Sequence, residues 1–192
     1  MKKRSWPSLV LLSALFLAPA AQARGGGGGG GGGSGVLFDV NLFYTSSKIE
    51  SKNTGGAATV TADGSTAIYD LKLGYLPGSG LYWGGIYTSR SNSVLNQSGT
   101  SGSALGASLG YMGSNGFFIM GHYLFSATEG DLSEGTGIQA DLGYKAGMGS
   151  GWVVGGELTY RSITYKKDAS NASLDSYKKD EVLPMISIGY LF

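Results

Sequence analysis

The sequence predicts an all-β protein, an eight-stranded antiparallel up-and-down barrel that crosses a membrane. Three observations carry this prediction: a strand-turn unit recurs four times, one face of each strand lacks charge, and only 14% of the 192 residues are charged. A soluble domain usually carries about 25–35% charged residues on its surface. A wall that faces lipid explains the shortage of charge, and the length suits one domain.

A Gly-Tyr pair closes each of the four units, at 74–75, 110–111, 143–144 and 189–190. Short glycine-rich turns at 77–80, 114–116 and 148–151 follow the first three pairs. Four up-and-down units predict eight strands, near 36–46, 66–76, 81–90, 102–112, 117–126, 137–146, 152–164 and 181–192. Short turns at one end and long polar loops at the other, near 47–65, 91–101, 127–136 and 165–180, are typical of transmembrane barrels.

Alternation within the strands separates two faces. One face carries apolar, aromatic and small residues such as Phe38, Leu73 and Trp83, and no charge. The other face mixes small and polar residues with eight charged residues: Asp39, Asp70, Lys72, Arg90, Asp141, Lys145, Glu157 and Arg161. A soluble lipocalin-like barrel would bury the apolar face. Small residues on the polar face suit a narrow lumen, and tyrosines at strand ends suit a membrane interface, so we expect the apolar face outside.

The first 23 residues have the pattern of a cleaved secretory signal peptide. Lys2, Lys3 and Arg4 precede the apolar stretch from Leu9 to Ala18, and small residues at Ala21 and Ala23 suit signal peptidase. A transmembrane helix would need about 20 apolar residues. We expect residues 24–35, which include nine consecutive glycines, to be a flexible linker, and residues 36–192 to be the barrel.

The last strand resembles the C-terminal signature of Gram-negative outer-membrane barrels. The matching residues are Ile186, Ile188, Tyr190 and Phe192. The resemblance implies that the barrel-assembly machinery recognises them and that periplasmic chaperones deliver the chain. Residues 36–192 look like a small barrel of the OmpX or OmpA-transmembrane-domain kind. Pro184 departs from the pattern because it removes one ladder hydrogen bond.

The eight charges of the polar face sum to zero, and charges enclosed in a narrow barrel must be paired. Pairs two or four residues apart on one strand, such as Asp70 and Lys72, suggest an ion-pair network that plugs the lumen. The alternative is a selectivity gate for small ions. Eight strands leave little room for a channel, so the plug is favoured.

His122 is the one histidine of the chain, and alternation places Ser126 and Glu157 on its face. Serine, histidine and a carboxylate are the ingredients of acyl transfer. Some outer-membrane barrels deacylate lipid A in this way, but the His-x-Ser arrangement associated with them is missing here. We therefore expect a hydrogen-bonded lumen residue and no catalytic residue, cofactor or metal, since an isolated histidine makes a poor metal site.

Net charge and cysteine content exclude several classes of protein. Without Lys2, Lys3 and Arg4, 11 of the 14 basic residues remain against 13 acidic ones, which excludes a polycationic nucleic-acid binder. The chain has no cysteine and therefore no disulfide scaffold. The loop at 166–181 could dock anionic lipopolysaccharide, but its charges nearly cancel, which favours a solvated loop.

The sequence thus predicts a monomeric, non-enzymatic protein of the Gram-negative outer membrane, with a plugged lumen, four external loops, and a structural or surface-interaction role. Its expected partners are outer-membrane lipid and lipopolysaccharide. Two alternatives stay open: a narrow, porin-like channel for small solutes, and an enzyme that modifies lipid A.

Overall fold

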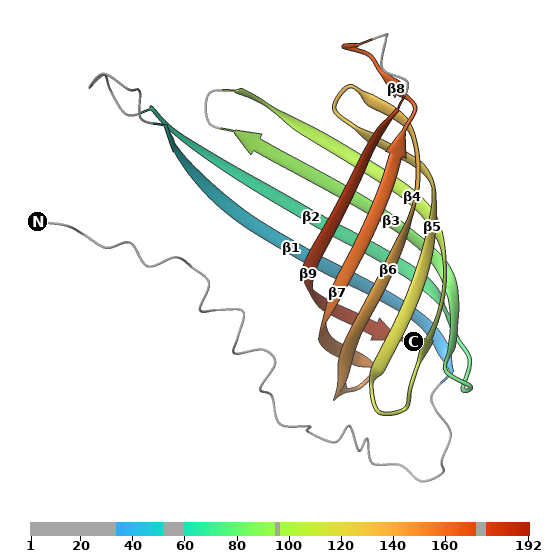
Figure 1. Ribbon diagram of the computed structural model, residues 1–192. Coiled ribbons are helices and arrows are strands. Elements are labelled where there is room, and N and C mark those ends of the chain that lie inside the picture. The colour runs from blue at the N-terminus through green and yellow to red at the C-terminus, as the bar shows by residue number, and fades with distance from the viewer. Residues whose placement is uncertain (1–33, 52–59, 95–96, 172–175) are drawn as a thin grey trace, which may run out of the picture.

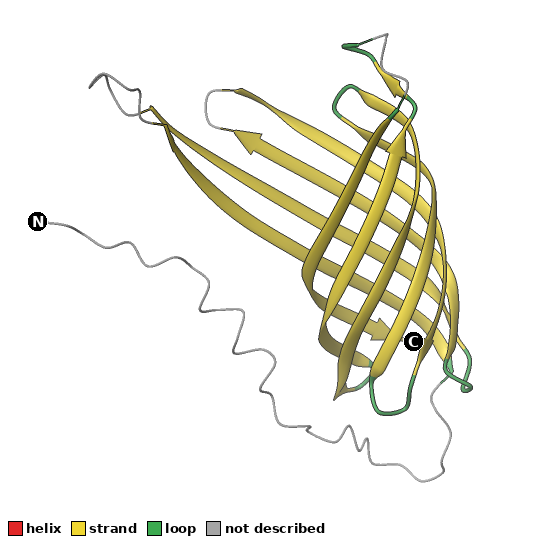
Figure 2. Ribbon diagram, viewed as in Figure 1, coloured by secondary structure: helices red, strands yellow, loops and turns green. Residues whose placement is uncertain are grey.

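A computed structural model describes residues 34–51, 60–94, 97–171 and 176–192. Strands make up nearly all of them, as Figure 2 shows. The long strands are β1 (Gly35–Ser51), β2 (Val60–Leu76), β3 (Leu81–Val94), β4 (Gln97–Met112), β5 (Phe117–Glu129), β6 (Leu132–Gly149), β7 (Trp152–Tyr165) and β9 (Tyr177–Leu191). The two-residue β8 (Lys167–Asp168) pairs with the start of β6 at Leu132–Ser133.

The eight long strands form one closed antiparallel barrel (Figure 1). Each pairs with its neighbours in chain order, and β9 pairs with both β7 and β1, which closes the sheet. The predicted eight-stranded antiparallel barrel is confirmed. None of the described residues forms a helix that is long and apolar enough to cross a membrane.

The short turns lie within the predicted ranges, and the third is shorter than predicted, at 150–151, because β6 continues to Gly149. Gly80, Gly116 and Gly151 have φ angles of 83°, 86° and 86°, a region that favours glycine. The N–H of Gly80 donates to the carbonyl of Pro77 at 2.9 Å. A Cβ at Gly80 would lie 2.4 Å from the carbonyl oxygen of Met112, so a larger residue would also disturb the next strand.

The strands extend further toward the long loops than predicted. β1 continues to Ser51 and β2 begins at Val60, inside the predicted loop 47–65. β5 and β6 are joined only by the turn at 130–131, so most of the predicted loop 127–136 is strand. The apolar alternation fades there, but serine, threonine and valine continue the ladder. Gly35, expected in the linker, is the first residue of β1; residues 1–33 lie outside the described part.

The uncharged face lies outside, as predicted. Exposed leucine, isoleucine, valine and phenylalanine side chains form an apolar belt that includes Phe38, Leu73, Leu109, Ile119 and Ile138. Exposed aromatic residues border it at both ends. The loop-end girdle contains Tyr44, Tyr69, Tyr87, Tyr123 and Tyr160, and the turn-end girdle contains Tyr75, Trp83, Tyr111, Tyr144, Trp152 and Phe192.

The Gly-Tyr repeat has a packing reason. Its tyrosines face outward, and its glycines face the lumen, where they leave room for large side chains of a neighbouring strand. A Cβ at Gly74 would lie 2.5 Å from the ring of Tyr82, and one at Gly143 would lie 2.7 Å from the ring of Phe118. These rings pack with Leu37, Leu76 and Met120 in a buried apolar cluster. This cluster fills the lumen at the end with the short turns.

Candidate functional site: the polar lumen

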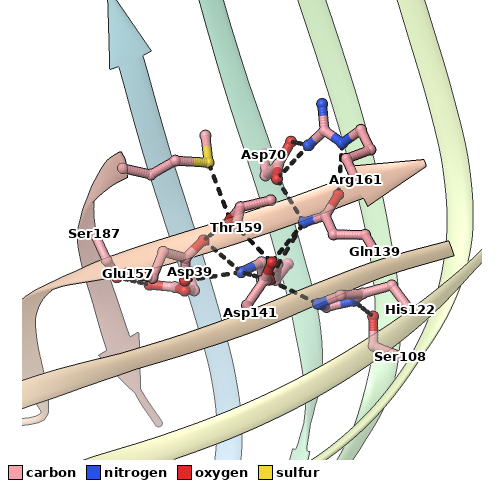
Figure 3. Close-up of polar contacts among 12 residues, drawn as sticks. Asp39, Asp70, Ser108, His122, Gln139, Asp141, Glu157, Thr159, Arg161 and Ser187 are labelled. Carbon is pink, nitrogen blue, oxygen red and sulfur yellow. Dashed lines mark hydrogen bonds and ion pairs between the residues drawn. The ribbon is translucent and has the colours of Figure 1, made fainter. Parts of the chain in front are cut away.

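Above the apolar cluster, the middle of the lumen is filled by a network of buried charged and polar side chains (Figure 3). Lys72 of β2 lies at its centre and is 1% exposed. Its Nζ donates to Asp141 of β6 and, at 2.8 Å, to Glu157 of β7. Asp141 also accepts from Thr159 at 2.9 Å. One cation therefore joins two carboxylates from the opposite wall of the barrel.

A second group surrounds Asp70 of β2. The Nη2 atom of Arg161 donates to both oxygens of Asp70 at 2.8 Å, and its Nε donates to Gln139 at 2.8 Å. Gln139 in turn donates to Asp70 and to Asp141, each at 3.0 Å. Thr88 donates to Asp70 at 2.7 Å. Gln139 thus connects this group to the ion pairs of Lys72.

A third group lies toward the short turns. Lys145 of β6 forms an ion pair with Asp39 of β1, and its Nζ lies 5.0 Å from the ring centroid of Phe118. Lys145 also donates to the hydroxyl of Ser187 at 2.5 Å, and that hydroxyl donates to Asp39 at 2.8 Å. The Phe118 contact joins the polar network to the apolar cluster below it.

The structure places seven of the eight predicted lumen charges in these three groups and places Arg90 apart. The pairs link different strands, not the same-strand neighbours that the sequence suggested. Arg90 lies nearer the long loops, where its guanidinium donates to Glu129 at 3.2 Å and to Glu181 at 2.5 Å. Lys179 donates to Glu129 at 2.5 Å. Sequence reasoning missed Glu129 and Lys179 because it placed both in loops.

Because Glu129 is ion-paired with Arg90 and Lys179, we expect the free energy of unfolding to depend on pH. Burial opposes the charged form of Glu129, but the hydrogen bond from Lys179 and the charge of Arg90 outweigh it, so its pKa lies below the ordinary 4.5. A lowered pKa stabilises the fold above the ordinary value, and this stability is lost as pH falls through the lowered one. In urea unfolding, acidification from neutral pH to below 4.5 should therefore lower the free energy of unfolding of the wild type more than that of Glu129→Gln. Equal losses would show that the paired carboxylate contributes nothing.

His122 lies between a serine and an aspartate, but not those that the sequence suggested. Its Nδ1 lies 2.7 Å from the hydroxyl of Ser108, and its Nε2 lies 2.7 Å from Asp141. Ser126, expected on the face of His122, points outward and is exposed. The β4–β5 register shifts at this point, pairing Leu105 with Ser126 and the next residue of β4 with Leu124. This bulge reverses the alternation, so the expectation for Ser126 was wrong.

The Ser108–His122–Asp141 set has the hydrogen-bond order of an acyl-transfer triad. Two features weigh against catalysis. All three side chains are buried, with Ser108 the most exposed at 6%. Asp141 is also shared with Lys72, Thr159 and Gln139, so it is not dedicated to orienting the histidine. Among the described residues, no group of three or more histidine, aspartate or glutamate side chains is arranged to hold a metal ion.

The side chains in the middle of the lumen are almost completely buried, and those of Lys72, Asp141 and Thr159 are at most 1% exposed. Beside Arg90 and Tyr165, toward the long loops, lies a cavity of about 20 Å³, with room for roughly one water molecule. Below it come the polar network and then the apolar cluster. The predicted loop at 166–181 lies partly outside the described residues, and within it the exposed Lys167 pairs with Glu134 of β6.

No protein-family model matches the sequence, and no curated protein matches it. Among solved structures, the chain is similar to the solid-state NMR structure of outer membrane protein AlkL in DMPC lipid bilayers. The two are 15% identical, with a TM-score of 0.43, over 87% of this chain and 94% of that one. It is also similar to outer-membrane expressed OmpT of Vibrio cholerae, at 18% identity and a TM-score of 0.35. That match covers 83% of this chain and spans about half of OmpT, 52%.

Proposed function

We propose that the chain is an integral outer-membrane barrel of a Gram-negative bacterium that catalyses no reaction and has a structural or surface-interaction role. The observation that carries this proposal is an apolar belt, bordered by two aromatic girdles, around a lumen filled by paired charges. An uncharged outer face suits lipid, and a closed sheet pairs its backbone groups internally. Outer-membrane lipid and lipopolysaccharide are then its immediate partners, and the strand ends at the long loops form its external surface.

A filled lumen argues against a channel. An ion crossing it would have to displace Lys72 from two carboxylates and then pass the apolar cluster around Tyr82. We therefore expect the purified chain, without residues 1–23, to give no discrete conductance steps in planar bilayers at neutral pH. Regular single-channel steps would overturn the proposed plug and support the alternative of a narrow solute channel.

The hydrogen bonds of Ser108, His122 and Asp141 favour one second candidate, an enzyme that modifies lipid A. In this alternative Ser108 is the nucleophile and His122 its general base. Mass spectrometry of lipid A from cells that express the wild type or Ser108→Ala separates the two proposals. The proposed non-enzymatic role predicts identical lipid A in both strains and in cells without the protein. A change that appears with the wild type and is lost in Ser108→Ala would support the enzyme.

Assembly should depend on the terminal residues that resemble the outer-membrane signature. Phe192 is largely exposed on the outer surface, and its ring packs against Tyr190 with centroids 4.7 Å apart. Full burial of such a side chain is worth about 1.5–3 kcal/mol, and less at an interface. Deleting Phe192 should therefore leave refolding of the purified chain into detergent largely intact.

In cells, the same deletion should strongly reduce the amount of folded protein in the outer membrane, because the assembly machinery would no longer recognise the strand. Heat-modifiable gel migration measures the folded fraction in both settings. Phe192→Tyr keeps a terminal aromatic and is the control. Normal membrane levels of the truncated chain would show that this residue does not direct assembly.

A further inference from the structure

The seam between β1 and β9 is shorter than every other seam of the barrel. Six residue pairs join the two strands, from Leu37–Leu191 to Leu42–Ile186, whereas each other pair of neighbouring long strands has at least ten. Toward the long loops, β1 leans away from β9 together with β2, as Figure 1 shows. On the long-loop side of Leu42 and Ile186, the backbone edges of β1 and β9 are therefore not paired with each other, and this unpaired stretch is called the slot below.

Pro184 explains why the pairing stops there. The N–H of Phe192 donates to the carbonyl of Val36 in β1, and that of Leu191 donates toward the other side, to Gly151. Because N–H groups alternate sides along a strand, those of even-numbered residues in β9 point toward β1. The next such position beyond Ile186 is Pro184, which has no N–H to donate. Its pairing with Leu158 of β7 on the other side continues without interruption.

The slot lies at the level of the loop-end girdle. Val182 pairs with Tyr160 of that girdle, and the exposed side chains of Tyr44 and Val182 flank the slot. By the same alternation, the backbone groups of these two residues point into the slot from opposite sides. At this level of a membrane, headgroups and water supply hydrogen-bond partners that the hydrocarbon core lacks.

The slot has apolar neighbours on its lumen side and on its outer side. Toward the lumen, Ile68, Leu183 and Met185 form a buried cluster with Phe43, which separates the slot from the polar network. On the outer surface, an open groove of about 590 Å³ begins at Leu42 and follows the paired part of the seam toward the short turns. Its lining is apolar and aromatic: Phe38, Val40, Leu42, Trp152, Ile188, Gly189, Tyr190 and Phe192. This volume is in the range of small-molecule sites.

We propose that the slot and the groove together bind one lipid of the outer leaflet, with its polar head in the slot and an alkyl chain in the groove. The head supplies hydrogen bonds to the edges of β1 and β9 beside Tyr44 and Val182. The chain covers Val40 and Ile188 and extends along the groove toward Trp152. This inference rests on the proposed membrane location. It differs from general lipid contact because it predicts one saturable site at one seam of the barrel.

In the chain without residues 1–23, the two remaining tryptophans report on this site separately. Trp152 lines the groove, whereas Trp83 lies in the same girdle on β3, away from the seam. Single-tryptophan variants, Trp83→Phe and Trp152→Phe, are titrated in detergent micelles with a phosphatidylethanolamine that carries bromine atoms in one acyl chain. We expect Trp152 fluorescence to fall saturably at about one lipid per protein and Trp83 fluorescence to fall only gradually with bulk lipid. Gradual quenching of both would overturn the proposed site.

Two further variants test the slot and the groove. Pro184→Val restores the missing N–H, so pairing should extend to Tyr44, amide exchange at Tyr44 should slow at least tenfold, and saturable quenching of Trp152 should disappear. Val40→Phe should fill the groove and abolish the quenching without slowing exchange, whereas Leu109→Phe, elsewhere on the apolar belt, should change neither. Unchanged quenching in both Pro184→Val and Val40→Phe would overturn the inference.

A measurement in lipid vesicles tests the proposed membrane location separately from the lipid site. In vesicles made of the brominated lipid, a membrane-spanning barrel gives strong quenching of both tryptophans. Absence of quenching in vesicles would reject the proposed location and the lipid site together. Quenching in vesicles without a saturable phase in micelles would reject the lipid site alone.

Discussion

Lys72→Met is expected to lower the free energy of unfolding by about 3–5 kcal/mol, the usual cost of removing one partner from a buried ion pair. Lys72 is the cation between Asp141 and Glu157, and its side chain is 1% exposed. Without it, two carboxylates face each other inside the lumen with no positive charge between them. Methionine has a similar volume, so the loss reports charge and not a cavity. Urea unfolding in lipid vesicles, followed by heat-modifiable gel migration, measures it.

Two variants identify the cause of this loss. Lys72→Met combined with Asp141→Asn and Glu157→Gln removes the uncompensated charges and should recover most of the lost stability. Lys178→Met removes an exposed cation whose ion pair with Asp180 spans 3.2 Å, and it should cost less than about 1 kcal/mol. If Lys72→Met were as mild as Lys178→Met, the lumen network would not be a determinant of stability.

The strand number, the turns and the division into two faces could be predicted because each depends on local patterns. Alternation places Asp39, Lys72 and Glu157 on the inner face wherever the strands pair. The partners could not be predicted in this way. Lys72 and Glu157 are 85 residues apart and meet across the lumen, which depends on the stagger and tilt of the whole closed sheet.

Two local features could also not be recognised from the alternation of apolar and polar residues along the strands. The bulge beside Ser126 reverses the faces within one strand, and no glycine or proline marks it in the sequence. Glu181, one partner of Arg90, lies at the start of the predicted last strand, but its pairing with Arg90 could not be predicted. Glu129, the other partner, lies where β5 continues beyond the apolar belt. There both faces carry polar residues, so alternation no longer distinguishes strand from loop. Among the local irregularities, Pro184 alone could be recognised in the sequence, because a proline removes one ladder hydrogen bond from the last strand.

Leu73→Arg is expected to destabilise the barrel in lipid by about 2–4 kcal/mol, the cost of an arginine facing the middle of a bilayer. Leu73 directly follows Lys72, and its side chain is 56% exposed on the apolar belt between Tyr69 and Tyr75. Two adjacent residues would then carry positive charge on opposite faces of one strand. At position 72 the charge stabilises the fold because carboxylates surround it, and at position 73 it faces hydrocarbon.

Two control variants, measured by urea unfolding in vesicles, separate the effect of membrane exposure from general damage to the strand. Leu73→Ala removes the apolar side chain without adding charge, so it should cost clearly less than Leu73→Arg. Ser91→Arg places an arginine at an exposed position of β3 beyond Tyr87 and should cost about 0–1 kcal/mol, as expected near an interface. If Leu73→Arg were no worse than Ser91→Arg in vesicles, the belt would not lie in hydrocarbon. The apolar outer face would then require a protein partner in place of lipid.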